Sequence, residues 1–220
     1  ETRRFGFREI EIRGTQIYWN GVRANLYGDY QSMDQDGYHN KSSDISPEGW
    51  PAQIDRIKAM NIRVLRFHHC PPANHILDAA DEKGLLICNE SPNYARKYLT
   101  GTDRDAYVAN FKKAVAGWIV PQRNHPSVYL WNATNEMTYT TLGGFTAAQC
   151  MEMGEAIRRL DPTRPIGYDG DERVAQSAML NRHYPEGYNK EPEGSIYSWN
   201  SQADEKKRTL PDKPTGSGEM

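Results

Sequence analysis

The sequence predicts an α/β fold, namely a (β/α)8 TIM barrel truncated after the seventh strand. Short apolar runs alternate with segments of helical periodicity along most of the chain. These runs are continuous rather than alternating, which is typical of parallel strands that are buried on both faces and covered by helices. About seven strand–helix units follow one another from residues 22–26 onward, and so many units in one chain favour a barrel over a doubly wound sheet.

All 220 residues are assigned to one domain, with a lead-in hairpin at residues 1–21 and the barrel from about residue 22. The hairpin rests on Asn20-Gly21, because both residues tolerate the positive φ angles of a two-residue turn. Strands are expected around it at residues 9–13, 16–19 and 22–26. Residues 28–49 are polar and are predicted to form a long loop, a feature that tends to be functional in compact domains.

A change of periodicity marks the first helix. Ser46 suits the N-cap and Pro47 the first helical position, and apolar residues then recur at helical spacing until Asn61. Further helices are predicted at residues 76–83, 103–120 and 146–160. The apolar strands between and after the helices are predicted at residues 62–67, 85–88, 128–131, 164–168, 179–180 and 214–218.

Composition and motifs exclude several classes of function. Lys+Arg 27 against Asp+Glu 29 gives a formal charge of −2, so there is no basic excess to bind a nucleic acid. No apolar run approaches the roughly 18 residues of a membrane span. Neither G-x-G-x-x-G nor G-x-x-x-x-G-K-[ST] occurs, so no nucleotide site is expected, and no other cofactor is predicted. Three cysteines are too few for a disulfide framework.

Polar residues follow the apolar runs, and in a βα barrel the active site is built at the C-terminal ends of the strands. Asparagine, histidine, tyrosine, arginine and carboxylates recur at these predicted ends. The strand-end segments include Asp29, Arg66, His69, Asn135, Glu136, His183, Tyr184 and Glu219. Their convergence on one mouth predicts a site for a polyhydroxylated substrate. Two carboxylates facing each other across such a site, here Glu136 and Glu219, are the machinery of glycoside hydrolysis.

Four segments carry a resemblance to glycoside hydrolase family 2. Residues 123–131 read RNHPSVYLW and lead to Asn135-Glu136, which resembles the family's RNHPSV…W…NE signature. Residues 60–71, MNIRVLRFHHCP, are similar to its N…VR.SHYP strand. Residues 78–92, which include DEKGLLI and ESP, and the opening GFREI with WNG resemble two further segments. Together these matches cover most of residues 5–136 in the family's order.

The resemblance implies a retaining, exo-acting β-glycosidase with a (β/α)8 catalytic domain, similar to β-galactosidases, β-glucuronidases and β-mannosidases. It implies that Glu136 is the acid/base and that Asn135 binds the 2-hydroxyl of the sugar, a contact that strengthens in the transition state. Glu219, which follows Lys213-Pro214, is implied as the nucleophile. One carboxyl must be protonated and the other ionised, so their surroundings must separate their pKa values.

Further side chains are assigned to the substrate or to the nucleophile. Arg66 is expected to keep the nucleophile ionised, because a nearby cation favours a carboxylate, and Tyr184 is expected to hydrogen-bond it. His69 is implied to line the sugar subsite, and His183 lies in the same strand-end segment as Tyr184. Trp199, in a polar stretch, is a candidate platform for a sugar ring.

Departures from the family pattern leave alternatives open. The segment before Glu219 reads TGSG rather than an apolar run, and His68 stands where a serine is usual. One alternative is therefore a carbohydrate-binding barrel with impaired catalysis. Another is an endo-acting hydrolase of a related barrel family. Asp29 either binds sugar hydroxyls or caps the loop that follows it.

The remaining expectations concern metals and partners. His68, His69 and Cys70 suggest a metal cluster, but adjacent residues of a strand point to opposite faces, so no metal site is predicted. Glu90 is interpreted as a network carboxylate rather than a catalytic base. The expected partner is a β-glycoside, and the resemblance implies flanking β-sandwich domains absent from this chain. The family's habit of export implies a secreted or periplasmic protein.

Overall fold

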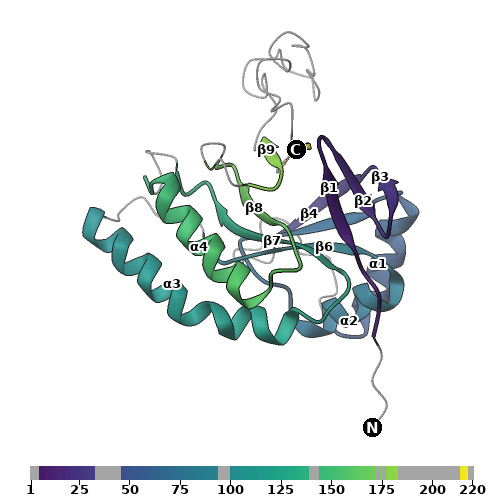
Figure 1. Cartoon of the computed structure of the whole chain (residues 1–220). Coiled ribbons are helices and arrows are strands. Elements are labelled where there is room, and N and C mark those ends of the chain that lie inside the picture. Colours follow the sequence, from purple (N-terminus) through teal and green to yellow (C-terminus); the bar gives the residue numbers. More distant parts are fainter. Residues whose placement is uncertain are drawn as a thin grey trace, which may run out of the picture.

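The computed structural model describes residues 5–32, 46–93, 100–138, 144–171, 174, 177–182 and 214–217. Within them, one sheet of five parallel strands has the order β4-β5-β6-β7-β8 (Figure 1). Its strands are β4 (Gly28–Ser32), β5 (Val64–His68), β6 (Leu86–Glu90), β7 (Val128–Asn135) and β8 (Ile166–Asp169). The spatial order follows the chain order, without the switch point of a doubly wound sheet. The sheet therefore has the topology of a barrel wall, as predicted.

A helix connects each strand of this sheet to the next. The helices are α1 (Gly49–Ala59), α2 (Asn74–Lys83), α3 (Gly101–Gln122) and α4 (Ala147–Leu160). α3 and α4 each begin with a capping box, in which Thr100 or Thr146 exchanges hydrogen bonds with the residue three positions later. α2 is followed by Gly84, whose φ of 69° lies in the left-handed region that favours glycine. All four predicted helices are confirmed, with shifted ends.

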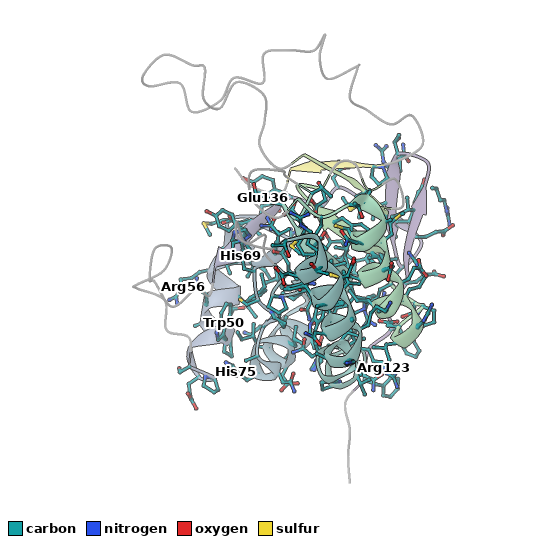
Figure 2. All side chains as sticks on the ribbon, turned by 90° about the vertical axis from the view of Figure 1, so that its left-hand side faces the viewer. Trp50, Arg56, His69, His75, Arg123 and Glu136 are labelled. Atoms are coloured by element: carbon teal, nitrogen blue, oxygen red, sulfur yellow. The ribbon has the colours of Figure 1, made fainter. Side chains whose placement is uncertain are left out.

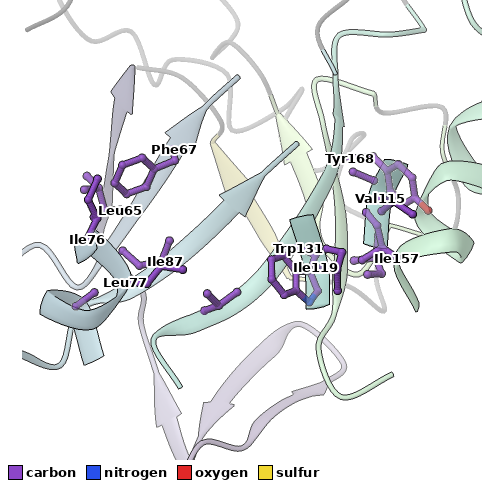
Figure 3. Packing of buried hydrophobic residues seen from close by; sticks show 14 of the residues in the cluster. Leu65, Phe67, Ile76, Leu77, Ile87, Val115, Ile119, Trp131, Ile157 and Tyr168 are labelled. Carbon is purple, nitrogen blue, oxygen red and sulfur yellow. The ribbon is translucent and has the colours of Figure 1, made fainter. Parts of the chain in front are cut away.

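The four helices cover one face of the parallel sheet. Alternate side chains of the strands, such as Leu65 and Phe67 in β5, pack with buried residues of the helices in one hydrophobic core. Figure 3 labels ten members of this core: Leu65, Phe67, Ile76, Leu77, Ile87, Val115, Ile119, Trp131, Ile157 and Tyr168. Successive residues of a strand point to opposite faces, so Arg66 faces away from the helices. That second face is the interior side of the barrel wall.

A three-stranded antiparallel sheet precedes the barrel. Its strands are β1 (Ile10–Arg13), β2 (Gln16–Trp19) and β3 (Val22–Ala24). Asn20 and Gly21, with φ angles of 49° and 76°, form the two-residue turn between the paired residues Trp19 and Val22, which confirms the predicted hairpin. Ile10 and Trp19 pack against a second apolar cluster, made of Val64, Leu86, Cys88, Tyr129 and Leu130.

The first parallel strand differs from the prediction. Residues 22–26 were expected to open the barrel, but β3 pairs with β2 in the antiparallel sheet. Gly28–Ser32, expected in a loop, instead forms β4 and pairs with β5. Its sequence GDYQS has no apolar run by which a strand could be predicted. The strand is defined instead by its backbone pairing with β5. The parallel sheet therefore starts at Gly28, after a lead-in sheet that extends to Ala24.

A second parallel pair continues the series of strands. β9 (Leu180–Arg182) pairs with β10 (Thr215–Ser217), and β9 lies against β8. Among the residues described, β10 is the seventh parallel strand in chain order. Among all the described residues, no helix combines the length and the apolarity needed to cross a membrane.

Candidate active site

A layer of buried polar side chains lies on the interior face of the parallel sheet. Because strand residues alternate between faces, the positions between core residues carry Arg66 in β5, Glu90 in β6, Asn132 in β7 and Asp169 in β8. All four residues are buried. Glu90 and Asp169 are the last residues of their strands, at the C-terminal ends where barrel enzymes build their sites.

The guanidinium group of Arg66 is the centre of this layer. Its Nε donates to Glu90 Oε2 at 2.6 Å and its Nη2 to Glu90 Oε1 at 3.1 Å, while Nη1 forms an ion pair with Asp169. Burial alone would lower the pKa of Arg66, but the carboxylates of Asp169 and Glu90 outweigh it and raise that pKa above its usual value. One permanent cation is thus shared by two buried carboxylates, as buried charges require.

Glu90 is saturated by donors. Besides Arg66, its Oε2 accepts from Asn132 Nδ2 at 2.5 Å and its Oε1 from the main-chain N–H of His69 at 2.9 Å. Burial raises the pKa of the Glu90 carboxyl, against the opposing effect of Arg66. Glu90 therefore belongs to a structural network, in agreement with its interpretation from the sequence.

The orientation of Asn135 follows from Arg66. Arg66 Nη2 donates to Asn135 Oδ1 at 3.1 Å, which turns the amide NH2 of Asn135 toward His69 Nε2, 2.9 Å away. Since the amide group can only donate there, His69 Nε2 accepts and the ring proton is on Nδ1. His68 Nδ1 lies 2.8 Å from Arg66 Nη2 and must accept for the same reason, so its proton is on Nε2. Both imidazoles are neutral in this arrangement.

His68 and His69 stand side by side, contrary to the expectation that neighbouring side chains diverge. His69 follows the last residue of β5 with a φ of 59°, and this left-handed turn brings its ring to 3.4 Å from that of His68, centroid to centroid. Ligand atoms of His68, His69 and Glu90 lie within 4.8 Å of one another. We assign no metal to them, because Arg66 already binds the carboxylate that a cation would need.

Glu136 follows the last residue of β7 in a similarly unusual conformation. Its φ is 53°, and its main-chain N–H donates to the carbonyl oxygen of Asp169 at 2.9 Å. Its residue is 8% exposed, beside the fully buried Asn135. Figure 2 shows Glu136 and His69 toward one end of the molecule, with His75 and Arg123 toward the other. Non-glycine residues held at positive φ cluster at functional sites.

A second buried carboxylate, Asp171, contacts the chain around Glu136. Asp171 Oδ1 accepts from the main-chain N–H and the hydroxyl of Thr138, at 2.7 and 2.8 Å. Its Oδ2 accepts from the hydroxyl of Thr134 at 2.5 Å. Burial raises the pKa of the Asp171 carboxyl, and these hydrogen bonds oppose that shift. Thr134 and Thr138 lie on either side of Glu136, so Asp171 contacts the chain before and after it.

The structure brings together part of the predicted site. Arg66, His69 and Asn135 are joined by direct hydrogen bonds, and Glu136 is the next residue in the chain. Asp29 is placed differently from the prediction: it is exposed, it is the second residue of β4 rather than a residue beyond a strand end, and it accepts from its neighbouring amide. Four predicted site residues lie outside the described residues, namely His183, Tyr184, Trp199 and Glu219.

Two residues of the site were not foreseen, Asp169 and Asp171. The strand predicted at residues 164–168 ended one position too early to include Asp169, whose side chain pairs with Arg66. A signal was present, because Asp169 continues the alternation of the strand after the core residue Tyr168. Asp171 follows Gly170, whose φ of 64° turns the chain back toward β7, and no pattern in the sequence marks that turn as part of a site.

Comparison with known proteins places this arrangement in a family. The sequence profile described as "Glycosyl hydrolases family 2, TIM barrel domain" matches residues 10–219. The chain belongs to glycosyl hydrolase family 2. The membership confirms the family that the sequence resembles and the predicted barrel.

Curated relatives in family 2 are much longer than this chain. It is 28% identical to a β-glucuronidase of Paenibacillus borealis over 174 residues, which cover 73% of the chain and 28% of the relative. It is 24% identical to a β-galactosidase of Lactococcus lactis subsp. lactis (strain IL1403), with 81% of the chain and 17% of the relative covered. The chain therefore spans less than a third of either relative.

Solved structures of family 2 enzymes share the fold. The β-glucuronidase of Parabacteroides merdae superposes with a TM-score of 0.65 at 27% identity, over 81% of this chain and 22% of that one. The β-glucuronidase 3 of Bacteroides uniformis gives a TM-score of 0.68 at 26% identity, over 83% and 24%. These structures support the same barrel topology for the described strands and helices.

Proposed function

We propose that this chain supplies the catalytic barrel of a retaining β-glycosidase, in which Glu136 is the acid/base. The observation that carries the proposal is the placement of Glu136 at the end of β7, directly after an asparagine whose orientation Arg66 determines. Membership in glycosyl hydrolase family 2 supports a glycosidase. The curated relatives named β-glucuronidase and β-galactosidase support a β-linked sugar as substrate.

The reaction divides into two displacements. In the first, the protonated carboxyl of Glu136 donates its proton to the glycosidic oxygen while the nucleophile attacks the anomeric carbon, so the aglycone leaves as an alcohol. We assign the nucleophile to Glu219, which lies outside the described residues. In the second, the Glu136 carboxylate takes a proton from water, and the resulting hydroxide equivalent displaces the enzyme from the sugar.

Arg66, Asn135 and His69 prepare the site for the sugar in this proposal. Asn135 is held by Arg66 on its oxygen and faces His69 with its NH2 group. The contact with Arg66 is buried and the contact with His69 is partly buried, so little reorganisation is needed when a sugar hydroxyl approaches. Pre-oriented hydrogen-bond donors contribute most when they are strengthened in the transition state.

The test uses the full protein with aryl glycosides that differ in leaving-group pKa. A panel of β-glucuronides, β-galactosides and β-mannosides identifies the sugar. Glu136→Gln is then expected to lower kcat by about 10²–10⁴-fold for poor leaving groups and far less for activated ones. If no β-glycoside is hydrolysed while oligosaccharides still bind in calorimetry, the barrel is a carbohydrate-binding domain and the proposal is wrong.

A further inference from the structure

We infer that Asp171 is a positioning residue for Glu136, an inference that rests on the proposed role of Glu136. Asp171 does not belong to the Arg66 network. Its carboxylate instead bridges the residues two positions before and two positions after Glu136, through Thr134 and Thr138. The chain thus passes through Glu136 with both flanks bound to one buried side chain.

We call the contacts of Asp171 with Thr134 and Thr138 the clamp. The backbone conformation of Glu136 requires contacts of this kind. A left-handed backbone costs an L-residue about 1–2 kcal/mol, and such residues persist only where their surroundings over-determine them. Glu136 has a φ of 53°, and contacts from the segment 169–171 hold it there. The carbonyl oxygen of Asp169 accepts from the Glu136 N–H, and the carboxylate of Asp171 accepts from Thr134, Thr138 and the main chain of Met137.

Burial makes the clamp rigid. Asp171 is 1% exposed, and Thr134 and Thr138 are also buried, so water cannot replace their hydrogen bonds without entering the core. Met137, between Glu136 and Thr138, is fully buried, and its carbonyl oxygen accepts from the N–H of Phe145 at 2.9 Å. Loss of the Asp171 carboxylate would remove the acceptor of the Thr138 N–H and of the Thr138 and Thr134 hydroxyls.

Two substitutions of Asp171 separate a role of its hydrogen bonds from a role of its negative charge. In Asp171→Asn, Oδ1 can still accept from Thr138, and the new NH2 group can donate to the Thr134 hydroxyl, which then acts as the acceptor. Asp171→Ala removes every contact. The positioning role therefore predicts that asparagine restores what alanine loses, and that the pH profile of the asparagine variant matches that of the parent.

Asp161 provides a matched control. It is also buried and also accepts from both the N–H and the hydroxyl of a threonine, Thr163, at 3.0 and 2.6 Å. It lies beyond the last residue of α4, near the start of β8, and its contacts do not involve Glu136. Asp161 also accepts from Trp131 Nε1 in β7 and pairs with the buried Arg164, so Asp161→Ala loses these contacts as well. It is therefore a stringent control for what loss of a buried, threonine-bound carboxylate does to stability and activity.

The first measurement is hydrogen exchange of the peptide that contains residues 134–138, in the full protein. Asp171→Ala is expected to accelerate this exchange by about tenfold or more relative to other β7 amides, whereas Asp171→Asn and Asp161→Ala leave it close to the parent rate. Unchanged exchange in Asp171→Ala overturns the clamp whatever the activity is. If Asp171→Ala does not fold, Thr134→Val removes the Thr134 arm and is read in the same way, while Thr138→Val removes only the hydroxyl bond of Thr138 and keeps its main-chain N–H on Asp171.

The second measurement is kcat against leaving-group pKa. Asp171→Ala is expected to lose about tenfold or more for poor leaving groups with little loss for activated ones, as Glu136→Gln does, because a displaced acid fails where protonation is needed. A uniform loss across leaving groups, as expected for Asp161→Ala, would make Asp171 merely structural and overturn the inference. If Glu136→Gln shows no such dependence, the proposed function fails, and hydrogen exchange alone decides the clamp.

Discussion

The main-chain N–H of Glu136 donates to the carbonyl oxygen of Asp169 at 2.9 Å, and the side chain of the same Asp169 forms an ion pair with Arg66. One residue at the end of β8 thus connects the backbone of the proposed acid/base with the guanidinium that orients Asn135. The positions of Glu136 and Asn135 are therefore determined by neighbouring strands as well as by the strand that carries them.

The backbone of Glu136 predicts an unusual ranking of two variants. Both Glu136→Gly and Glu136→Ala remove the side chain, but only glycine accepts a φ of 53° without strain. We expect the glycine variant to have the larger free energy of unfolding, by about 1 kcal/mol, the reverse of the ranking found in helices. Urea denaturation checks it, and an alanine variant as stable as the glycine variant would show that this conformation is not strained.

The hydrogen bonds of the two histidines predict their tautomers. His68 should carry its proton on Nε2 and His69 on Nδ1, because Arg66 and the Asn135 amide donate to the other nitrogens. Nitrogen-15 NMR of labelled imidazoles near neutral pH distinguishes the two forms directly. Asn135→Asp is expected to reverse the His69 tautomer, since a carboxylate accepts where the amide donates. A doubly protonated ring in the parent would rule out the assigned network.

Some of these contacts could be foreseen and others could not. The apolar runs identified β5 to β8, and alternation from core residues such as Leu65 correctly places Arg66 on the opposite face. β4 was missed because GDYQS has no apolar signature and is held by pairing with β5. Asp29 was therefore expected beyond the end of a strand, whereas it is the second residue of β4. Apolar runs reveal burial, whereas backbone pairing between distant segments leaves no trace in the local sequence.

The turns after the strands were the second source of error. His69 was expected to point away from His68, but its φ of 59° reverses that direction. Asp171 became part of the site because Gly170 turns the chain after β8. Neither conformation is required by the residue types concerned. Both are imposed by tertiary contacts, which is why the resemblance pointed to Glu136 as the candidate acid/base but not to the groups that hold it.

The lowered pKa of Asp161 predicts that this residue contributes to the loss of stability at acid pH. Burial would raise the pKa of its carboxyl, but hydrogen bonds from Thr163 and Trp131 and the charge of Arg164 outweigh it and lower that pKa to about 2. A lowered carboxyl pKa stabilises the fold above the unfolded value of about 4, and this stability is lost as the pH falls toward 2. Asp161→Asn should be less stable than the parent at pH 7, with a smaller decline between pH 4 and pH 2. Chemical denaturation across this range checks it, and parallel curves would contradict it.

The close approach of α4 to β8 at Gly154 predicts the effect of a substitution there. A Cβ built there would lie 1.8 Å from the hydroxyl of the buried Tyr168, whereas nothing lies within 4 Å of a Cβ at Gly117, which is exposed in α3. We expect Gly154→Ala to destabilise the protein by about 1–3 kcal/mol and Gly117→Ala to stabilise it by about 0.5–1 kcal/mol. Thermal and denaturant unfolding measure both. Equal effects of the two substitutions would contradict the close approach of α4 to Tyr168.

The role of Glu136 as acid/base is tested most directly by chemical rescue. In Glu136→Ala the second displacement lacks its base, and added azide can attack the glycosyl-enzyme without one. With an activated aryl β-glycoside as substrate, we predict that azide accelerates turnover of Glu136→Ala, but not of the parent, and that the product is the β-configured glycosyl azide. No acceleration, or a glycosyl azide of α configuration, would contradict the proposed acid/base and the retaining mechanism.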